Sequence, residues 1–293
     1  MDVVAIFGPT GVGKTGVAEA LARLLRERGG DPIAVSADAL QIYRGLETLT
    51  GAADGSGDLE TVLRSNLSVT ERFSAGAFAE QAHAAIDSAL ASGRRPIVVG
   101  GTGLYLRAAL TELRLKPPPP PGLRERIDAD MAARGAAALH ADLAARAPER
   151  AAAIAPTDRS RIVRALELHE MGALGDYGDQ LWTDEMRVPT RLFGLVMDRE
   201  SLYARIDARV DAMVAAGAAD EVRAADAAGA SRTARAALGF SELLEGDVDA
   251  MKRRTRQYAK RQLTWMRKLA GVELLDVTDG DAGAAAERIA ATL

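Results

Sequence analysis

The sequence predicts an α/β protein with a parallel β-sheet covered by helices and a helical insertion in the middle of the chain. Short apolar runs alternate with helix-like stretches over roughly the first 110 residues. That alternation is typical of a parallel sheet whose strands are joined by covering helices. Five consecutive prolines, Pro117–Pro121, then interrupt the pattern, and an alanine-rich stretch follows them.

In the first part of the chain, apolar runs bounded by glycines and acids predict the strands and helices of the core. The predicted elements are a strand Val3–Phe7, a helix to about Arg28, a strand Ile33–Ser36, a helix Ala75–Ser92 and a strand Pro96–Val99. Few apolar residues and several glycines leave the stretch 51–74 without a clear pattern.

The proline run predicts a rigid, extended connector into a separate helical region. Alanine-rich helices are expected from Leu123 to Gly172, and a polar loop from Gly172 to Pro189. The core resumes with a strand Arg191–Met197, a helix Leu202–Gly217 and a strand Val272–Val277. We therefore expect residues 1–116 and 191–293 to form the core, and residues 117–190 to form the insertion.

Charge and composition narrow the possible functions. The net charge of −4 over 293 residues means that any site for a polyanion has to be a local patch. The chain has no cysteine, which excludes disulfides, thiolate catalysis and cysteine zinc sites, and which suits a cytoplasmic enzyme. No apolar run reaches the roughly 18 residues of a membrane span, so no membrane association is expected.

A glycine-rich segment between the first strand and the first helix matches G-x-x-x-x-G-K-T. In that context the motif predicts a P-loop NTPase-like core, whose backbone N–H groups and helix N-terminus surround a di- or triphosphate. The lysine supplies a positive charge and the last threonine a hydroxyl for Mg²⁺. The predicted phosphate-binding residues are Gly8, Pro9, Thr10, Gly11, Val12, Gly13, Lys14 and Thr15.

The position of the nearest acid argues against a nucleotide-hydrolysing motor. Such proteins place an acid at the end of a hydrophobic strand to help hold the metal, but the third strand here ends Val99-Gly100-Gly101. Asp38 instead follows the second strand. Because the carboxyl ends of parallel strands line the ligand crevice, we expect Asp38 to lie near the phosphate-binding loop.

Four segments together resemble the tRNA dimethylallyltransferases, also called tRNA isopentenyltransferases. These segments are Gly8–Thr15, Ser36–Gly45, Val99–Leu110 and Thr255–Trp265, with weaker matches at Arg161–Glu167 and Ala237–Phe240. They span nearly the whole chain in the order found in the family, and the combination is far more specific than a phosphate loop alone.

The resemblance implies transfer of a prenyl group from dimethylallyl diphosphate to the exocyclic amine of the adenosine 3′-adjacent to the anticodon. Asp38 would be the general base, Thr102 would lie beside the reacting groups, and Gln41 would recognise the adenine edge. A cytoplasmic monomer is expected, with tRNA bound through its anticodon stem-loop. The tRNA-binding residues implied by the family are Asp38, Ala39, Leu40, Gln41, Thr102, Arg124, Arg161 and Arg164.

A basic run near the C-terminus supports an RNA partner. Its cations, with no acid between them, are Lys252, Arg253, Arg254, Arg256, Lys260, Arg261, Arg267 and Lys268. On a helix, spacings of three and four residues bring several of these side chains onto one face. We expect Arg256 and Lys260 to contact tRNA phosphates, although a solvated helix face is the commoner meaning of such a pattern.

Three other functions share parts of this pattern. A small-molecule kinase has the same phosphate loop and an acid after the second strand, but it binds ATP and covers it with a lid. An adenylate prenyltransferase shares the core and does not need an insertion that binds tRNA. A non-catalytic RNA-binding protein has no need for Lys14, Thr15, Asp38 and Thr102 together.

Overall fold

The computed structural model describes the whole chain except residues 54, 56 and 176–180, and it contains two compact units. The first unit comprises Met1–Leu113 and Leu181–Leu293, and the second comprises Arg114–Gln180. Residues 176–180, in the middle of the loop predicted from Gly172 to Pro189, lie outside the described residues.

The first unit is built on a six-stranded sheet in which every paired strand is parallel, so the predicted α/β fold class is confirmed. The order across the sheet is β4 (Thr61–Val62), β2 (Pro32–Ser36), β6 (Arg95–Gly100), β1 (Val3–Phe7), β7 (Thr190–Val196) and β8 (Glu273–Asp276). Strand β1 lies inside the sheet between β6 and β7, and all five of its residues are buried.

Alternate residues of β1 supply two apolar cores, one on each face of the sheet. Val4 and Ile6 belong to the core that contains side chains of α1 (Lys14–Glu27) and α12 (Ala282–Ala290). Val3, Ala5 and Phe7 belong to the core that contains side chains of α3 (Ala75–Ala91) and α4 (Gly103–Leu110). This double burial explains why β1 is a continuous apolar run.

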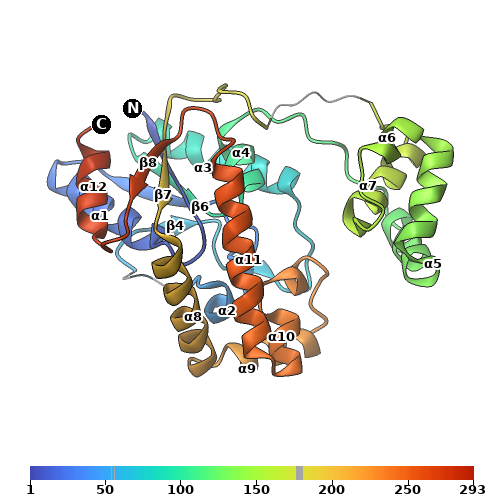
Figure 1. Ribbon diagram of the computed structural model, residues 1–293. Coiled ribbons are helices and arrows are strands. Elements are labelled where there is room, and N and C mark those ends of the chain that lie inside the picture. Colours follow the sequence, from blue (N-terminus) through green and yellow to red (C-terminus); the bar gives the residue numbers. More distant parts are fainter. Residues whose placement is uncertain (54, 56, 176–180) are drawn as a thin grey trace. The chain divides into compact units, whose positions relative to one another are not determined.

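The long helices α8 (Arg199–Ala215) and α11 (Val248–Met266) pack against each other (Figure 1). Sequence patterns did not predict the very short pair β3 (Tyr43–Arg44) and β5 (Leu67–Ser68), because two residues carry no periodicity. The smaller helices of this unit are α2 (Glu47–Thr50), α9 (Ala218–Ala227), a 3₁₀ turn (Ala234–Ala236) and α10 (Phe240–Glu245).

Within the described part of the chain, no helix is both long and apolar enough to cross a membrane.

The second unit is helical and has its own apolar core. It consists of α5 (Leu123–Arg146), α6 (Pro148–Ala152) and α7 (Arg159–Glu170), and α5 packs against the other two. Gly135 interrupts α5 with a φ of 80°, a left-handed conformation that glycine adopts without steric cost. Buried side chains of this core include Ile127, Leu139, Leu143, Ile162 and Leu166.

The boundary between the units differs from the one expected from the sequence, because residues 181–190 belong to the first unit. The Trp182 ring lies 4.6 Å from the Trp265 ring of α11, centroid to centroid. The backbone N–H of Arg187 donates to the Leu110 carbonyl at the end of α4, and its side chain pairs with Asp87 of α3. These contacts, made with residues distant in sequence, attach the polar segment to the core.

A buried carboxylate, Glu167 of α7, organises two arginines of the second unit. Arg124 and Arg164 both pair with this carboxylate, which is completely buried. Burial by itself would raise the pKa of the Glu167 carboxyl, but hydrogen bonds and charges of the two arginines outweigh burial and hold the pKa below its usual value. The cluster therefore stabilises the helical unit as long as Glu167 is ionised.

We expect Glu167→Gln to lower the stability of the second unit by about 2 kcal/mol, because the arginines lose their shared anion. Glu170→Gln removes the more exposed pairs with Arg126 and Arg146, and should cost less stability because water screens those pairs. The pKa of the Glu167 carboxyl is lower in the folded protein than its ordinary value of 4.5. Ionised Glu167 therefore stabilises the folded state at any pH above 4.5, and this stabilisation is lost as the pH falls through the pKa of the folded protein. Hydrogen exchange over residues 123–170, compared at pH 7 and pH 4, measures the cost of each substitution and its pH dependence. Equal protection in the Glu167→Gln and Glu170→Gln variants would contradict a stabilising role of Glu167.

Candidate active site

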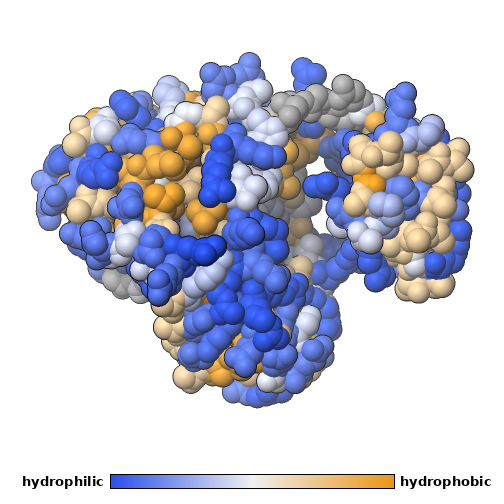
Figure 2. Space-filling view, viewed as in Figure 1, coloured by the Kyte–Doolittle hydropathy of each residue, from blue (hydrophilic) through white to orange (hydrophobic). Residues whose placement is uncertain are grey.

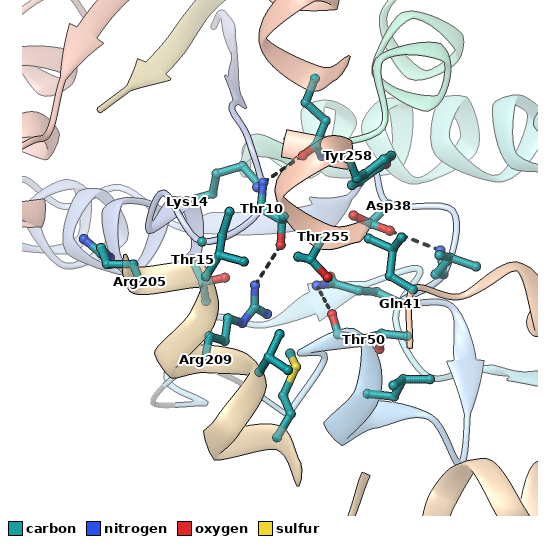
Figure 3. A pocket seen from close by; sticks show the side chains of 18 of the residues that line it. Thr10, Lys14, Thr15, Asp38, Gln41, Thr50, Arg205, Arg209, Thr255 and Tyr258 are labelled. Atoms are coloured by element: carbon teal, nitrogen blue, oxygen red, sulfur yellow. Dashed lines mark hydrogen bonds between the residues drawn. The ribbon is translucent and has the colours of Figure 1, made fainter. Parts of the chain in front are cut away.

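A cavity of about 230 Å³ lies in the first unit at the carboxyl ends of the sheet strands. One side is formed by the phosphate-binding loop and the residues after β2, and the other by α8 and α11 (Figure 3). Polar side chains of the cavity include Thr10, Lys14, Thr15, Asp38, Gln41, Arg205, Arg209, Thr255, Tyr258 and Gln262. Its apolar wall includes Leu49, Ile206, Val210, Met213, Leu238 and Met251.

The predicted phosphate-binding loop, Gly8–Thr15, joins β1 directly to α1, as the motif predicts. Gly11 and Gly13 have φ values of 83° and 101°, which residues with a side chain rarely adopt. This conformation allows the loop to turn tightly into the first turn of α1, whose N–H groups have no partner within the helix. The cavity is thus lined by the kind of backbone that binds anions. Of the other predicted loop residues, Gly8 and Pro9 contact Lys14, whereas Val12 is buried in the core.

Lys14 is half-buried, and its Nζ donates to the carbonyl oxygens of Gly8 and Pro9 at 3.0 Å each. The pKa of this amine is lowered to about 8, mainly by burial and to a smaller extent by the Arg209 charge, while the Asp38 carboxylate opposes both. At neutral pH the amine is therefore charged but poorly solvated. An anion in the cavity would stabilise that charge.

Asp38 follows β2 and lines the same cavity as Lys14. Its Oδ1 accepts a hydrogen bond from the Leu40 N–H at 3.1 Å, which orients the carboxylate. Thr102, at the start of α4, lies next to this segment, and its hydroxyl is 3.5 Å from the Ala39 nitrogen. The Thr102 hydroxyl also lies 3.3 Å from the Tyr258 hydroxyl of α11. Segments from three parts of the chain therefore meet at Asp38.

Gln41 lies at the edge of the cavity with both ends of its amide already bonded. Its Oε1 accepts from the Ser36 hydroxyl at 3.2 Å, and its Nε2 donates to the Thr50 carbonyl at 3.3 Å (Figure 3). The amide keeps a second N–H and a second oxygen lone pair, so these two bonds orient it without using up its capacity to pair with a base. Leu40, next in the chain, also lines the cavity.

Sequence reasoning missed the residues that α8 and α11 contribute. Arg205 and Arg209 are one helical turn apart on α8, and the Arg209 Nη1 donates to the Thr10 hydroxyl at 3.1 Å. Thr255, Tyr258 and Gln262 follow helical spacing on α11 and all face the cavity. That spacing of uncharged polar residues within a basic run was a usable signal.

Comparison with known proteins agrees with this arrangement. A family model described as IPP transferase matches residues 41–269 of the chain. The chain belongs to the IPP transferase family. A tRNA dimethylallyltransferase of Kineococcus radiotolerans is 41% identical, over 96% of this chain and 92% of that protein. One of Thermobifida fusca is 39% identical, over 91% of this chain and 87% of its own length.

The fold comparison gives the same result for this IPP transferase. The crystal structure of the full-length tRNA isopentenylpyrophosphate transferase from Bacillus halodurans aligns with a TM-score of 0.70 and 33% identity. The alignment covers 99% of this chain and 95% of that one. The similarity therefore includes both the sheet unit and the helical unit.

Several cations of the basic helix α11 already pair with acids in this IPP transferase, which the sequence did not indicate. The run contains no acid, but acids outside it pair with Lys252, Arg253, Arg254 and Arg256. Arg256 in particular pairs with Asp207 of α8. Lys260, Arg261 and Arg267 are exposed and, among the described residues, have no acidic partner. The surface over α11 is largely hydrophilic in Figure 2.

The arginines expected to contact the anticodon stem lie in the helical unit. The side chains of Arg124 and Arg164 are about one-third exposed and share Glu167, and Arg164 also donates to the Lys116 and Pro117 carbonyls. Arg161 is 73% exposed and lies 3.4 Å from Asp158. Arg161 is therefore the most accessible of the three.

Proposed function

We propose that this IPP transferase moves a dimethylallyl group from dimethylallyl diphosphate to the exocyclic amine of the adenosine next to the anticodon of tRNA, on its 3′ side. The observation that carries the proposal is the shared cavity of Asp38 and Lys14. A carboxylate that can accept a proton thus faces a loop suited to a diphosphate. Family membership supports the same chemistry.

The proposed reaction is a displacement at the allylic carbon. The adenine nitrogen forms a bond to that carbon while the carbon–oxygen bond to diphosphate breaks, and the electron pair leaves with the diphosphate. Asp38 accepts the proton that the amine loses, a role that typically contributes roughly 10²–10⁴-fold to the rate. Lys14 and Arg209 stabilise the negative charge that grows on the leaving oxygen.

The donor set fits a magnesium ion bound mainly through the substrate. No group of three or more His, Cys, Asp or Glu side chains capable of holding a metal occurs among the residues that the structure describes. Thr15 places a hydroxyl in the cavity and Asp38 a carboxylate, and both are the oxygen ligands that Mg²⁺ prefers. Mg²⁺ usually keeps several waters and binds through substrate phosphates. Thr15 would hold the ion, which when bound neutralises charge on the diphosphate.

The target base of the tRNA also has to reach the cavity. The target adenosine has to leave its stack, as in other enzymes that modify bases, so that its amine can approach Asp38. Ala39, Leu40, Gln41 and Thr102 lie at that end of the site and would contact the base. Arg124, Arg161 and Arg164 would contact the anticodon stem, and Lys260 the tRNA backbone.

Mass spectrometry of nucleosides from tRNA incubated with the protein, Mg²⁺ and dimethylallyl diphosphate tests the function. We expect a gain of one prenyl group on the adenosine 3′-adjacent to the anticodon. Free adenylate, offered in a parallel reaction, should remain unmodified. Modification of adenylate alone would favour the adenylate prenyltransferase, and transfer of phosphate from ATP to a small molecule would favour the kinase.

The ion pairs of α11 predict which cations matter for tRNA binding. Lys260→Gln with Arg267→Gln should weaken tRNA binding and lower the slope of log affinity against log salt by about 1–2, because both side chains are exposed. Arg256→Gln should lower the slope by less, since Asp207 already neutralises Arg256. Filter binding at 50–300 mM salt measures the slopes. A larger effect of Arg256→Gln would show that its pairing with Asp207 breaks when tRNA binds.

A further inference from the structure

A buried amide on α11 connects two loops of the active site. Gln262 is only 4% exposed. Its Oε1 accepts from the backbone N–H of Thr10 in the phosphate-binding loop at 2.8 Å. Its Nε2 donates to the backbone carbonyl of Gly101, in the turn between β6 and α4, at 2.7 Å. One side chain thus bonds two loops that are far apart in the sequence.

The packing around this amide shows that the connection is specific. A Cβ atom added at Gly101 would lie 2.3 Å from the Gln262 Nε2, so only glycine allows this approach. Thr10 is held a second time, by the bond from Arg209 to its hydroxyl. Gly101 immediately precedes Thr102, whose hydroxyl lies 3.3 Å from that of Tyr258, one turn before Gln262 on the same helix.

The two loops carry opposite halves of the proposed reaction. The phosphate-binding loop carries Lys14, which would contact the leaving diphosphate, and the turn after β6 carries Thr102, beside the Asp38 segment. Displacement requires the attacking nitrogen and the allylic carbon to approach within roughly 3–3.5 Å, and a misplacement of about 1 Å can cost 10²-fold in rate. The relative position of the two loops therefore matters directly for turnover.

We propose that Gln262 is a positioning residue that fixes the phosphate-binding loop against the turn after β6, and so sets the separation of the prenyl donor from the acceptor base. The proposal rests on the function proposed above. Gln262 lines the cavity, but both bonds of its amide go to the backbone of Thr10 and Gly101, and its proposed role acts through that backbone. Because the amide bonds with both ends, neither a shorter amide nor an apolar side chain of similar length can replace it.

Two substitutions separate length from hydrogen bonding. Gln262→Met keeps the length but removes both bonds, and Gln262→Asn keeps the amide but is too short to bond both loops. For each variant we expect kcat to fall roughly 10–100-fold, while KM for tRNA changes less than about threefold. Pyrophosphate, used as the probe of the loop in a calorimetric titration with Mg²⁺, should bind several-fold more weakly to Gln262→Met.

Met266→Ala is the matched control for simple loss of packing. Met266 is on the same helix and 2% exposed, but it lies outside the cavity. This variant should lower the melting temperature at least as much as Gln262→Met and yet keep kcat and pyrophosphate affinity near the wild-type values. If Gln262→Met keeps kcat within twofold, or if its losses only match those of Met266→Ala, the positioning role is wrong.

The two proposals fail in different ways. Absence of prenyl transfer by the wild-type protein would refute the proposed function, whatever the variants do. The pyrophosphate titration does not depend on prenyl transfer, so it still decides whether Gln262 orders the phosphate-binding loop. Unchanged pyrophosphate affinity in Gln262→Met would overturn the positioning role by itself.

Discussion

Asp38→Asn should reduce kcat for prenyl transfer by roughly 10²–10⁴-fold, while the affinity for tRNA changes less than about twofold. The substitution keeps the shape of the side chain and an oxygen that can accept from the Leu40 N–H. It removes only the charge and the ability to take a proton. Single-turnover assays with saturating tRNA, together with filter binding, separate these two effects.

One side effect of this substitution has to be controlled. The Asp38 charge raises the pKa of Lys14, so its removal lowers that pKa further below about 8. The assays therefore belong at pH 7 or below, where a larger fraction of Lys14 is protonated. Asp211→Asn is a suitable control, because Asp211 pairs with Lys252 and is more than half exposed. If Asp38→Asn retained near-normal turnover at pH 7, Asp38 would not be the general base.

Lys14→Met should lower kcat by roughly 10²–10³-fold and weaken pyrophosphate binding, because the leaving diphosphate loses a charged donor in a poorly solvated site. The same change should leave the melting temperature of the ligand-free protein equal or higher. Burial disfavours the charged amine, as the lowered pKa shows, so an apolar side chain removes an unfavourable desolvation. Activity and stability are thus expected to move in opposite directions.

A second lysine provides the comparison for this prediction. Lys252→Met makes the same chemical change on α11, where Lys252 pairs with Asp211 and does not line the cavity. We expect this control to keep kcat and pyrophosphate affinity. Thermal melting and calorimetric titration of both variants provide the measurements. A marked drop in the melting temperature of Lys14→Met would indicate that its bonds to the Gly8 and Pro9 carbonyls matter more than its charge.

Patterns within short stretches of the sequence were enough to predict the phosphate-binding loop and the position of Asp38. The strand, glycine-rich loop and helix around Lys14 could be predicted because each depends on local spacing and backbone preference. The placement of Asp38 also followed from the sequence, since parallel strands bring their carboxyl ends to one edge of the sheet. The resemblance of four segments to one family then pointed to prenyl transfer.

Only the tertiary structure decided which side chains complete the site. Arg209 and Gln262 both bond to Thr10 of the phosphate-binding loop, although they lie 199 and 252 residues after it in the chain. The basic pattern of α11 predicted a charged helix, but it could not show that Asp207 of another helix neutralises Arg256. Likewise, the polar segment after residue 180 gave no sign that Trp182 packs on Trp265. The physical reason is the same in each case: which face of a helix turns inward, and which charge lies opposite, depends on packing between elements that local periodicity does not contain.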